Sequence, residues 1–230
     1  MNEREAIKEV SMQEGYAYWA TSYDQEKNAL IAVEEIYVDP ILAQIPFEHV
    51  LDVGAGTGRY ALKLAREGAN VTALDQSPEM LTVARQRAQD EGLSIDFQLT
   101  SFDAGLPFAD NQFDLLICAL VLCHISDMGK TIGEFVRVLQ PGGYLLITDF
   151  HPGSVQVGWR TQFRQEGVKY LLPNVPHTRD DYLQALPSNG LSILQVLDLP
   201  LRKVPEGYLS SELLYGHEEQ LFGLIILAQK

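Results

Sequence analysis

Three glycines at every second position, Gly54, Gly56 and Gly58, follow an apolar run and precede a helical pattern. The stretch 49–64 reads HVLDVGAGTGRYALKL, and Asp52 stands just before the first glycine. Glycine permits a tight turn and lets a ligand lie against bare backbone, and a helix N-terminus adds unpaired N–H donors. The stretch is typical of a nucleotide-binding turn. A tight turn between a strand and a helix that binds no ligand is the alternative.

The spacing around this turn differs from the dinucleotide fingerprint. That fingerprint, G-x-G-x-x-G, has its third glycine where this chain carries Arg59. A carboxylate at Asp52 would repel a diphosphate and attract an ammonium or sulfonium group. Asp75 ends the next predicted strand, where a carboxylate can accept hydrogen bonds from both hydroxyls of a ribose. These residues predict a nucleoside ligand whose other end is cationic.

The elements that must position these residues alternate along the chain. Strand patterns cover 49–54, 70–75, 94–100, 113–121, 144–150, 192–202 and 222–229, and helix patterns cover 59–68, 78–91, 127–139 and 179–187. Ser77 is expected to cap the second of these helices, with Pro78 at its first position. Such alternation predicts βαβ units and a parallel sheet covered on both faces. Residues 1–45 are rich in helix formers, and 151–178 show no clear period.

Charge limits the classes of partner. The chain has 31 acidic and 17 basic residues and a net charge of −14, without a cluster of Lys and Arg. Nucleic-acid binders neutralise phosphates with such clusters. Binding to nucleic acid or to an anionic membrane is therefore disfavoured, and a neutral or cationic small molecule is the default partner.

The cysteines and the N-terminus indicate the compartment. Cys118 and Cys123 lie in or beside an apolar run, which favours buried free thiols and a reducing cytosol over a disulfide. The first ten residues, MNEREAIKEV, lack the apolar core of a signal peptide. We expect a cytoplasmic protein. The histidines and carboxylates show no metal-ligand spacing, so no metal is predicted.

Four stretches resemble the class I S-adenosylmethionine-dependent methyltransferases, and they occur in the family's order. They are LDVGAGTG (51–58), VTALDQSPEML (71–81), LPFADNQFDLLICALVLCHI (106–125) and LQPGGYLLITDF (139–150). The resemblance implies an α/β fold, a three-layer α-β-α Rossmann-like sandwich. Its sheet would have seven strands, mostly parallel, with the last strand antiparallel. The implied cofactor is S-adenosylmethionine, and the product is S-adenosylhomocysteine.

The resemblance also assigns cofactor contacts. Asp52 and the turn would face the methionine portion, and Asp75 would bind the ribose. The turn residues are Gly54, Ala55, Gly56, Thr57 and Gly58, and the further candidates are Gln76 and Met80 beside the adenine, Phe102 and Asp103 at its amine, and Ala119 near the methionine chain. Both Phe102 and Asp103 are kept because the following Leu-Pro-Phe motif begins one residue earlier than in the family.

An aromatic segment, YAYWATSYD (16–24), precedes the sheet. In similar enzymes an aromatic segment with a Tyr-Asp pair closes over the cofactor, and ring faces attract a sulfonium. Tyr16, Trp19 and Tyr23 are therefore candidate cofactor contacts, and residues 1–45 a candidate N-terminal helical lid. The alternative is an amphipathic helix that packs its rings onto the sheet.

Residues near the ends of two strands are candidates for the chemistry. His124 follows the fourth strand and His151 the fifth, so either imidazole could act as a general base, or could merely cap and pack. We expect residues 151–178 to form a substrate-pocket insertion in a methyltransferase domain that spans 46–230. Its candidate substrate contacts are Trp159, Phe163, Tyr170 and His177.

The insertion also contains Arg160, Arg164 and Lys169, which could hold a carboxylate or phosphate or could be solvated surface charges. The sequence as a whole favours methyl transfer to a small molecule, with O-methylation slightly ahead of N- or C-methylation because histidines are available as bases. The alternatives are methylation of a protein, and a module that binds a nucleotide cofactor without catalysis. The sequence contains no signal for the oligomeric state.

Overall fold

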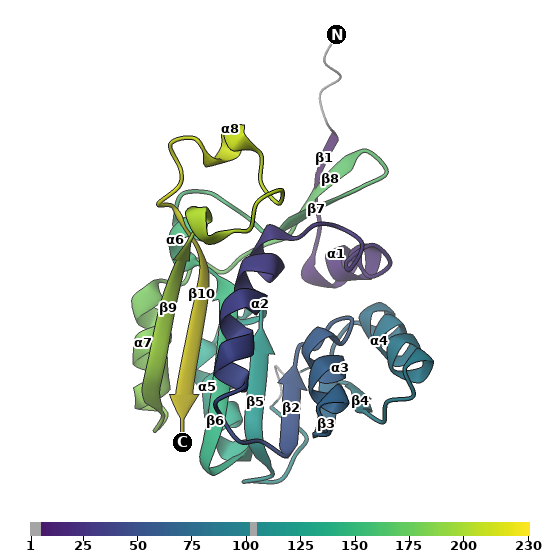
Figure 1. The fold of residues 1–230 in the computed structure, drawn as a ribbon, viewed down its shortest axis with the longest axis vertical. Coiled ribbons are helices and arrows are strands. Elements are labelled where there is room, and N and C mark those ends of the chain that lie inside the picture. Colours follow the sequence, from purple (N-terminus) through teal and green to yellow (C-terminus); the bar gives the residue numbers. More distant parts are fainter. Residues whose placement is uncertain (1–5, 102–104) are drawn as a thin grey trace.

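The computed structural model describes residues 6–101 and 105–230, and its centre is a seven-stranded sheet (Figure 1). The strand order is β4-β3-β2-β5-β6-β10-β9. The strands are β2 (His49–Val53), β3 (Asn70–Asp75), β4 (Asp96–Leu99), β5 (Phe113–Ala119), β6 (Leu139–Phe150), β9 (Ser192–Pro200) and β10 (Leu221–Gln229). The strand β10 runs antiparallel to both of its neighbours, and β2 to β6 are mutually parallel. The predicted fold class is confirmed.

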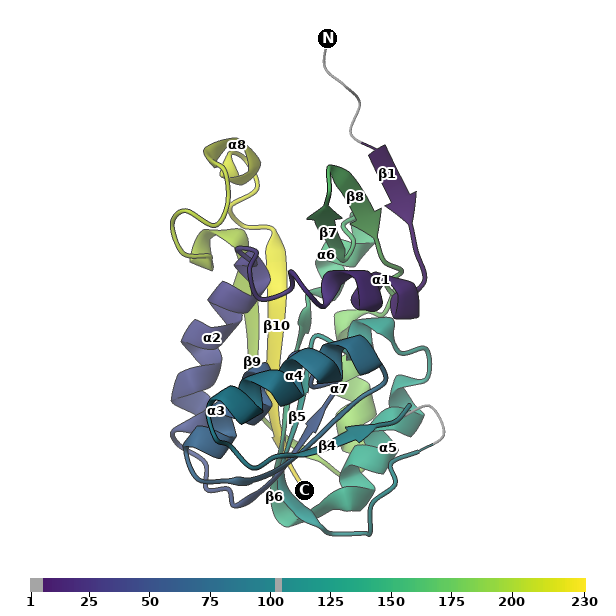
Figure 2. The same ribbon diagram turned by 90° about the vertical axis from the view of Figure 1, so that its right-hand side faces the viewer.

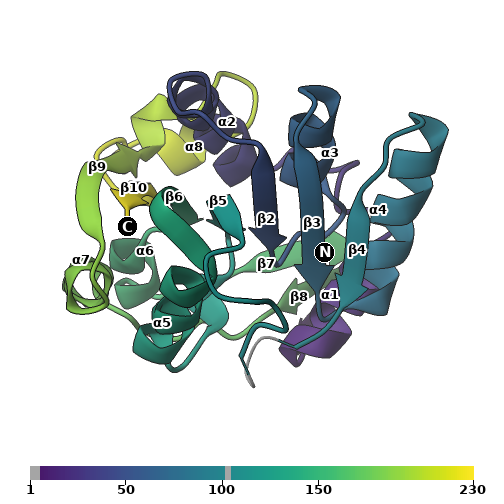
Figure 3. The same ribbon diagram turned by 90° about the horizontal axis from the view of Figure 1, so that it is seen from below.

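Helices cover both faces of this sheet, so the molecule has three layers. Figure 3 shows α2 and α3 on one face and α5 and α7 on the other, with α4 beside β4. Their bounds are α2 (Ala29–Leu42), α3 (Arg59–Arg66), α4 (Pro78–Asp90), α5 (Met128–Val138) and α7 (Arg179–Ser188). Each face packs on its own apolar cluster, because the buried strands carry apolar side chains on both sides. The expected start of α4 is confirmed, since the Ser77 hydroxyl accepts a hydrogen bond from the Met80 N–H.

A second, three-stranded sheet lies beyond the carboxyl ends of the parallel strands (Figure 2). Its strands are β1 (Ala6–Glu9), β8 (Val168–Leu171) and β7 (Gln162–Gln165), and β1 pairs with β8 in parallel. We call β1, β7 and β8 the cap sheet. The remaining elements are α1 (Met12–Trp19), η1 (Leu122–His124), α6 (Pro152–Gln156), η2 (Leu201–Lys203) and α8 (Ser211–Leu214).

The N-terminal region differs from the all-helical expectation. Ala6–Glu9 form a strand because the edge of β8 offers them a backbone partner. Within the same region, α2 is part of the main α/β unit, since Val33 and Val38 are fully buried against the sheet. The region 151–178, which has no clear period in sequence, contains α6, β7 and β8. The cap sheet therefore joins the expected lid and the expected insertion.

The two cysteines, Cys118 and Cys123, are buried free thiols, as expected. Within the described part of the chain, no helix has the length and apolarity needed to cross a membrane.

Candidate functional site

Two cavities lie where the parallel strands end. The smaller, of about 370 Å³, is bordered by the glycine turn and the end of β3, and we call it the turn cavity. The larger, of about 890 Å³, lies between the main sheet, the cap sheet and the segment 204–217, and we call it the cap cavity. Both volumes fall in the range typical of small-molecule sites.

Four residues line both cavities and mark the place where they meet: Tyr16, Tyr23, Leu120 and His124. Leu120 has a φ of +61°, a strained conformation for a leucine, directly after β5. Its N–H is held by the Thr148 carbonyl at 2.8 Å. This backbone conformation places Leu120 at the border of both cavities.

The glycines of the turn have separate structural reasons. Gly54 has a φ of +72°, and a Cβ there would lie 2.3 Å from Val121 Cγ2. Gly56 has a φ of +55°, and its absent Cβ would meet no atom within 4 Å because it borders the turn cavity. Gly58 caps α3, with Ala84 3.2 Å from where its Cβ would be. Gly54 and Gly58 serve close packing, and Gly56 leaves a bare backbone beside the cavity.

Asp75 is the carboxylate that borders the turn cavity. Its Oδ2 accepts a hydrogen bond from the Gly56 N–H and its Oδ1 from the Ser77 N–H, both at 2.8 Å. Burial raises the pKa of this carboxyl, and the backbone N–H donors oppose that shift. A carboxylate has about four lone-pair sites, and the Gln76 N–H also acts on this carboxyl. The remaining lone-pair capacity can accept from a ribose hydroxyl.

Asp52 lies behind the turn and is not among the residues that border either cavity. Its Oδ2 accepts a hydrogen bond from the Ala61 N–H at 3.0 Å, in the first turn of α3. The N-cap of this helix is Gly58, which has no side chain to do so. Burial raises the pKa of Asp52 to about 7. The structure therefore places Asp52 as a helix cap that supports the turn, in contrast to the expected direct contact with ligand.

The remaining predicted cofactor residues divide into three groups. Gln76, Met80 and Ala119 border the turn cavity, as do Tyr16 and Tyr23. Ala55, Thr57 and Gly58 do not border it. Phe102 and Asp103 lie outside the described residues.

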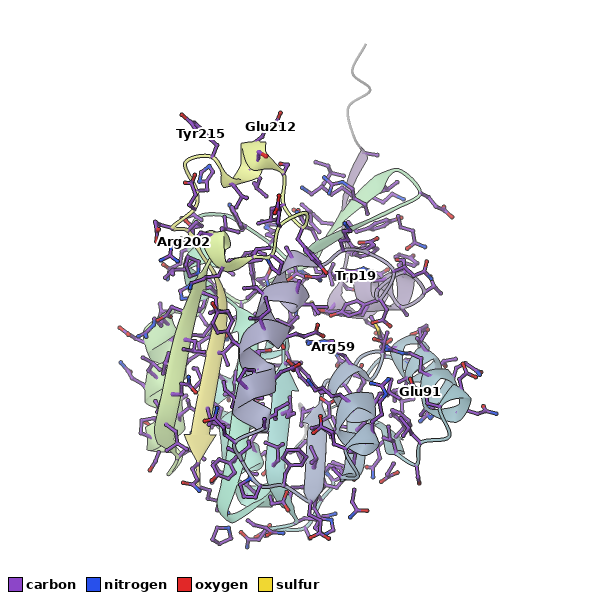
Figure 4. All side chains as sticks on the ribbon, in the orientation of Figure 1. Trp19, Arg59, Glu91, Arg202, Glu212 and Tyr215 are labelled. Carbon is purple, nitrogen blue, oxygen red and sulfur yellow. The ribbon has the colours of Figure 1, made fainter. Side chains whose placement is uncertain are left out.

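Ring stacking and the carboxylate of Asp24 hold the aromatic segment in place. We call Asp24, with its partners Thr57 and Arg87, the clasp. Trp19, labelled in Figure 4, stacks on Phe163 of the cap sheet at a ring distance of 4.8 Å and borders only the cap cavity. Asp24 accepts hydrogen bonds from the Thr57 hydroxyl at 3.0 Å and from Arg87 Nη1 at 2.8 Å. The clasp ties the aromatic segment to the glycine turn and to α4. Sequence reasoning found the Tyr-Asp pair but had no signal for Arg87.

Arg59, the residue that distinguishes this turn from a dinucleotide turn, points toward α2 (Figure 4). Its Nη2 lies 3.1 Å from the carboxylate of Glu34, which also accepts a hydrogen bond from the Tyr60 hydroxyl. Glu34 is 2% exposed, so its charge is balanced inside the protein. Arg59 thus anchors α3 to α2.

His124 is neutral and has a defined tautomer. Its Nδ1 lies 2.8 Å from the Pro173 carbonyl, which can only accept, so Nδ1 carries the proton. Its Nε2 therefore accepts the hydrogen bond from the Tyr16 hydroxyl at 3.1 Å. Desolvation lowers the pKa of His124 to about 4. The imidazole presents an uncharged acceptor at the junction of the two cavities.

The other two candidate histidines lie away from both cavities. In His151, Nδ1 accepts from the Gly153 N–H and Nε2 pairs with Asp198 at 3.0 Å, so both nitrogens are used to cap α6 and to hold β9. His177 Nε2 donates to the Ile125 carbonyl at 2.7 Å. Their place at strand and loop ends suggested a chemical role, but their nitrogens serve the backbone and neighbouring side chains.

The insertion supplies part of the cap cavity. Trp159 and Phe163 line it, whereas Tyr170 stacks behind Phe163 at 4.9 Å and does not. A segment that sequence reasoning missed, 204–217, closes the other side with Tyr208, Leu209, Leu213 and His217. The solvent-exposed Tyr215 directly follows its short helix α8, at the top of Figure 4. The sequence of this segment has scattered apolar residues and no motif, so nothing in it predicted a place at the cavity.

Metal chemistry has no visible support in residues 6–101 and 105–230. No group of three or more histidine, cysteine, aspartate or glutamate side chains in these ranges could hold a metal ion.

Comparisons with known proteins add independent evidence. Residues 51–147 match the family model described as a methyltransferase domain. The chain is 39% identical over 129 residues to a demethylmenaquinone methyltransferase of Tropheryma whipplei, which covers 56% of this chain and 51% of that protein. It is 30% identical over 157 residues to a ubiquinone biosynthesis O-methyltransferase of Xylella fastidiosa, covering 67% and 63% respectively. The matches thus span about half to three-fifths of these relatives' lengths.

A solved structure supports the fold. The S-adenosylmethionine-dependent methyltransferase of Mesorhizobium loti superimposes with a TM-score of 0.63 at 19% identity and covers 84% of this chain and 96% of the other. The family match falls on the strands and turn that border the turn cavity, and the predicted seven-stranded sheet is present. Residues 51–147 therefore match the methyltransferase-domain family, and the structural likeness extends the same fold over most of the chain.

Proposed function

We propose that this protein transfers a methyl group from S-adenosylmethionine to a small-molecule acceptor. The observation that carries the proposal is that the turn cavity and the cap cavity share four lining residues, Tyr16, Tyr23, Leu120 and His124. A cofactor in one cavity and an acceptor in the other would meet there. Bound S-adenosylmethionine would supply an electrophilic methyl group on a sulfonium. The alignment of the two reactants is the main contribution expected of the protein.

Residues of the turn cavity would hold the nucleoside end of the cofactor. Asp75 offers its remaining lone-pair capacity to a ribose hydroxyl, and Gly56 leaves the backbone bare beside it. Gln76 and Met80 border the same cavity and would flank the adenine. We retain Phe102 and Asp103 as candidates for the adenine amine on the basis of the family resemblance alone.

O-methylation is proposed ahead of N- or C-methylation because of His124. An acceptor hydroxyl that replaced the Tyr16 hydroxyl would donate to the same Nε2 lone pair. A group with a pKa of about 4 removes a proton from a free hydroxyl poorly at neutral pH. We therefore assign His124 to orienting the hydroxyl and to receiving its proton late, when methyl transfer has made that proton strongly acidic.

The names of the two relatives, a demethylmenaquinone methyltransferase and a ubiquinone biosynthesis O-methyltransferase, support a small-molecule acceptor. The volume of the cap cavity, about 890 Å³, supports it too, because it lies in the range of small-molecule sites. We also propose a cytoplasmic location, on the basis of the two free buried thiols.

Cofactor binding is tested by thermal unfolding with S-adenosylhomocysteine or with NAD. At a concentration of 100 times its Kd, S-adenosylhomocysteine should stabilise the protein by about 2.7 kcal/mol, and NAD should not. Asp75→Asn should lose most of this gain, whereas Asp96→Asn, at the exposed start of β4, should keep it. Stabilisation by NAD alone would contradict the proposal.

Acceptor class is tested with labelled methyl groups. Protein and labelled S-adenosylmethionine are mixed with a cell extract that has been divided into small molecules and macromolecules. Label is expected in the small-molecule fraction. Label in proteins alone would favour protein methylation, and no transfer despite tight cofactor binding would favour a non-catalytic module.

A further inference from the structure

The wall of the cap cavity has the opposite charge from the chain as a whole. The chain carries 31 acidic and 17 basic residues. Among the described residues that line this cavity, the charged ones are four cations and one carboxylate: Lys27, Arg160, Arg164, Lys169 and Glu26. A hollow lined by one sign of charge concentrates ligands of the other sign.

Two of these cations face each other across the cap sheet. Arg164 of β7 and Lys169 of β8 are direct cross-strand partners, so their side chains share one face of the hairpin. Like charges in this position destabilise a strand pair. Glu26, just after the aromatic segment, interacts with Arg164: burial raises the pKa of Glu26, and the charge of Arg164 opposes that shift. An anion placed between the side chains of Arg164 and Lys169 would be attracted by both cations.

The other two cations, Arg160 and Lys27, each have a partner and still line the cavity. Arg160 pairs with Glu9 of β1 at 2.9 Å, and both side chains are largely exposed. Lys27 lies over the ring of Tyr208 at 5.9 Å and so links the stretch just after the aromatic segment to the segment 204–217. An exposed pair of this kind is weak and can exchange partners.

The opposite wall of the cavity is aromatic. Phe150 ends β6 and Phe222 lies in β10, with their rings at 5.8 Å in an edge-to-face contact. Trp159 contacts Phe222 at 6.0 Å, also edge to face. All three border the cap cavity, so it combines an aromatic floor in the main sheet with a cationic hairpin in the cap sheet.

We infer that the methyl acceptor is an anionic aromatic molecule, whose carboxylate, phosphate or sulfonate is held by Lys169 and Arg164 and whose ring lies against Trp159, Phe150 and Phe222. This inference rests on the proposed function, since it identifies the acceptor of that same reaction. It differs from the preference for neutral or cationic molecules that the net charge alone suggests. The charge of the cavity wall determines which ligand charge is favoured there, because salt screens the more distant surface carboxylates.

The test uses two fluorescent probes of the same shape. 1-Anilinonaphthalene-8-sulfonate carries an anion on an aromatic body, and N-phenyl-1-naphthylamine is its uncharged counterpart. The sulfonate should bind the wild-type protein about tenfold more tightly than the amine, and added salt should reduce this preference. Lys169→Gln and Arg164→Gln should each reduce binding of the sulfonate by about three- to tenfold and leave the uncharged probe unchanged.

Arg66→Gln is the matched control, because Arg66 pairs with Glu91 on the surface and lines neither cavity. It should leave both affinities unchanged. Benzoate and phenyl phosphate should displace the sulfonate probe, and the uncharged benzyl alcohol should not. The anion that displaces it at the lower concentration indicates whether a carboxylate or a phosphate is the natural group.

Equal affinity for the two probes would overturn the inference, as would a preference for the sulfonate that survives in both the Lys169 and the Arg164 variants. Equal displacement by benzyl alcohol would overturn it too. S-Adenosylhomocysteine is titrated into each variant to show that the turn cavity is intact. Failure of the wild-type protein to bind it would reject the proposed function, while selective binding of the sulfonate would still establish the anion site.

Discussion

The clasp at Asp24 leads to the sharpest prediction about cofactor binding. Asp24→Ala removes the acceptor of two hydrogen bonds, one from the Thr57 hydroxyl and one from Arg87. The side chains of Asp24 and Arg87 are 36% and 34% exposed, so solvent screens their ion pair. We therefore discount the two interactions to about 1–2 kcal/mol in total.

This free energy holds the aromatic segment against the glycine turn. Because Tyr16 and Tyr23 border the turn cavity from that segment, loosening it should weaken cofactor binding by up to the same amount. The expected result is a Kd for S-adenosylhomocysteine that rises about 5- to 30-fold, measured by isothermal titration calorimetry. Asp24→Asn keeps an acceptor for Thr57 and loses the charge, so it should give an intermediate loss.

Glu91→Ala serves as the control for losing an acidic partner of an arginine. Glu91, labelled in Figure 4, pairs with Arg66 through two contacts of 2.5 and 2.6 Å and lines neither cavity. Its removal should leave the affinity unchanged. An unchanged affinity in Asp24→Ala, or an equal loss in both variants, would refute the reasoning that the clasp holds a lid over the cofactor.

Two further predictions separate stability from binding. Gly54→Ala should destabilise the protein by about 2–4 kcal/mol in urea unfolding, since it adds backbone strain and a clash with Val121; Gly56→Ala should cost about 1 kcal/mol and mainly weaken binding of S-adenosylhomocysteine, and the reverse ranking would contradict the roles given to these glycines. His124 has a folded-state pKa of about 4 against an ordinary value of 6.5, so its contribution to stability is complete above about pH 6.5 and is lost as the pH falls to about 4. The stability gap between wild type and His124→Gln should therefore shrink by at most about 3 kcal/mol between pH 7 and about pH 4.5, and a constant gap would show that the imidazole is not desolvated.

The main sheet could be predicted from the sequence because its signals are local. Alternating apolar strands, the Ser77 cap and the glycine turn each act over a few residues, and all agree on one fold. The placement of Asp75 beside the turn also followed, since parallel strands end at one edge of the sheet.

The rest depended on contacts between distant segments. Asp52 was expected to face the ligand, but whether a carboxylate turns toward a cavity or toward a helix N-terminus depends on side-chain direction. The Nε2 atom of His151 is paired with Asp198, 47 residues away, and no spacing rule predicts that pairing. Residues 204–217 reach the cap cavity through the fold alone, with no motif of their own.

The parallel pairing of β1 with β8 sets the order in which this molecule can assemble. The paired residues Ala6 and Val168 lie about 160 positions apart, so the strand made first must wait until most of the chain has left the ribosome. The glycine turn and β3 are complete long before that. The growing chain can therefore form the glycine turn and the end of β3 while the cap sheet over the cap cavity is still incomplete, and we expect the closing of that long loop to be the late, slow step of folding.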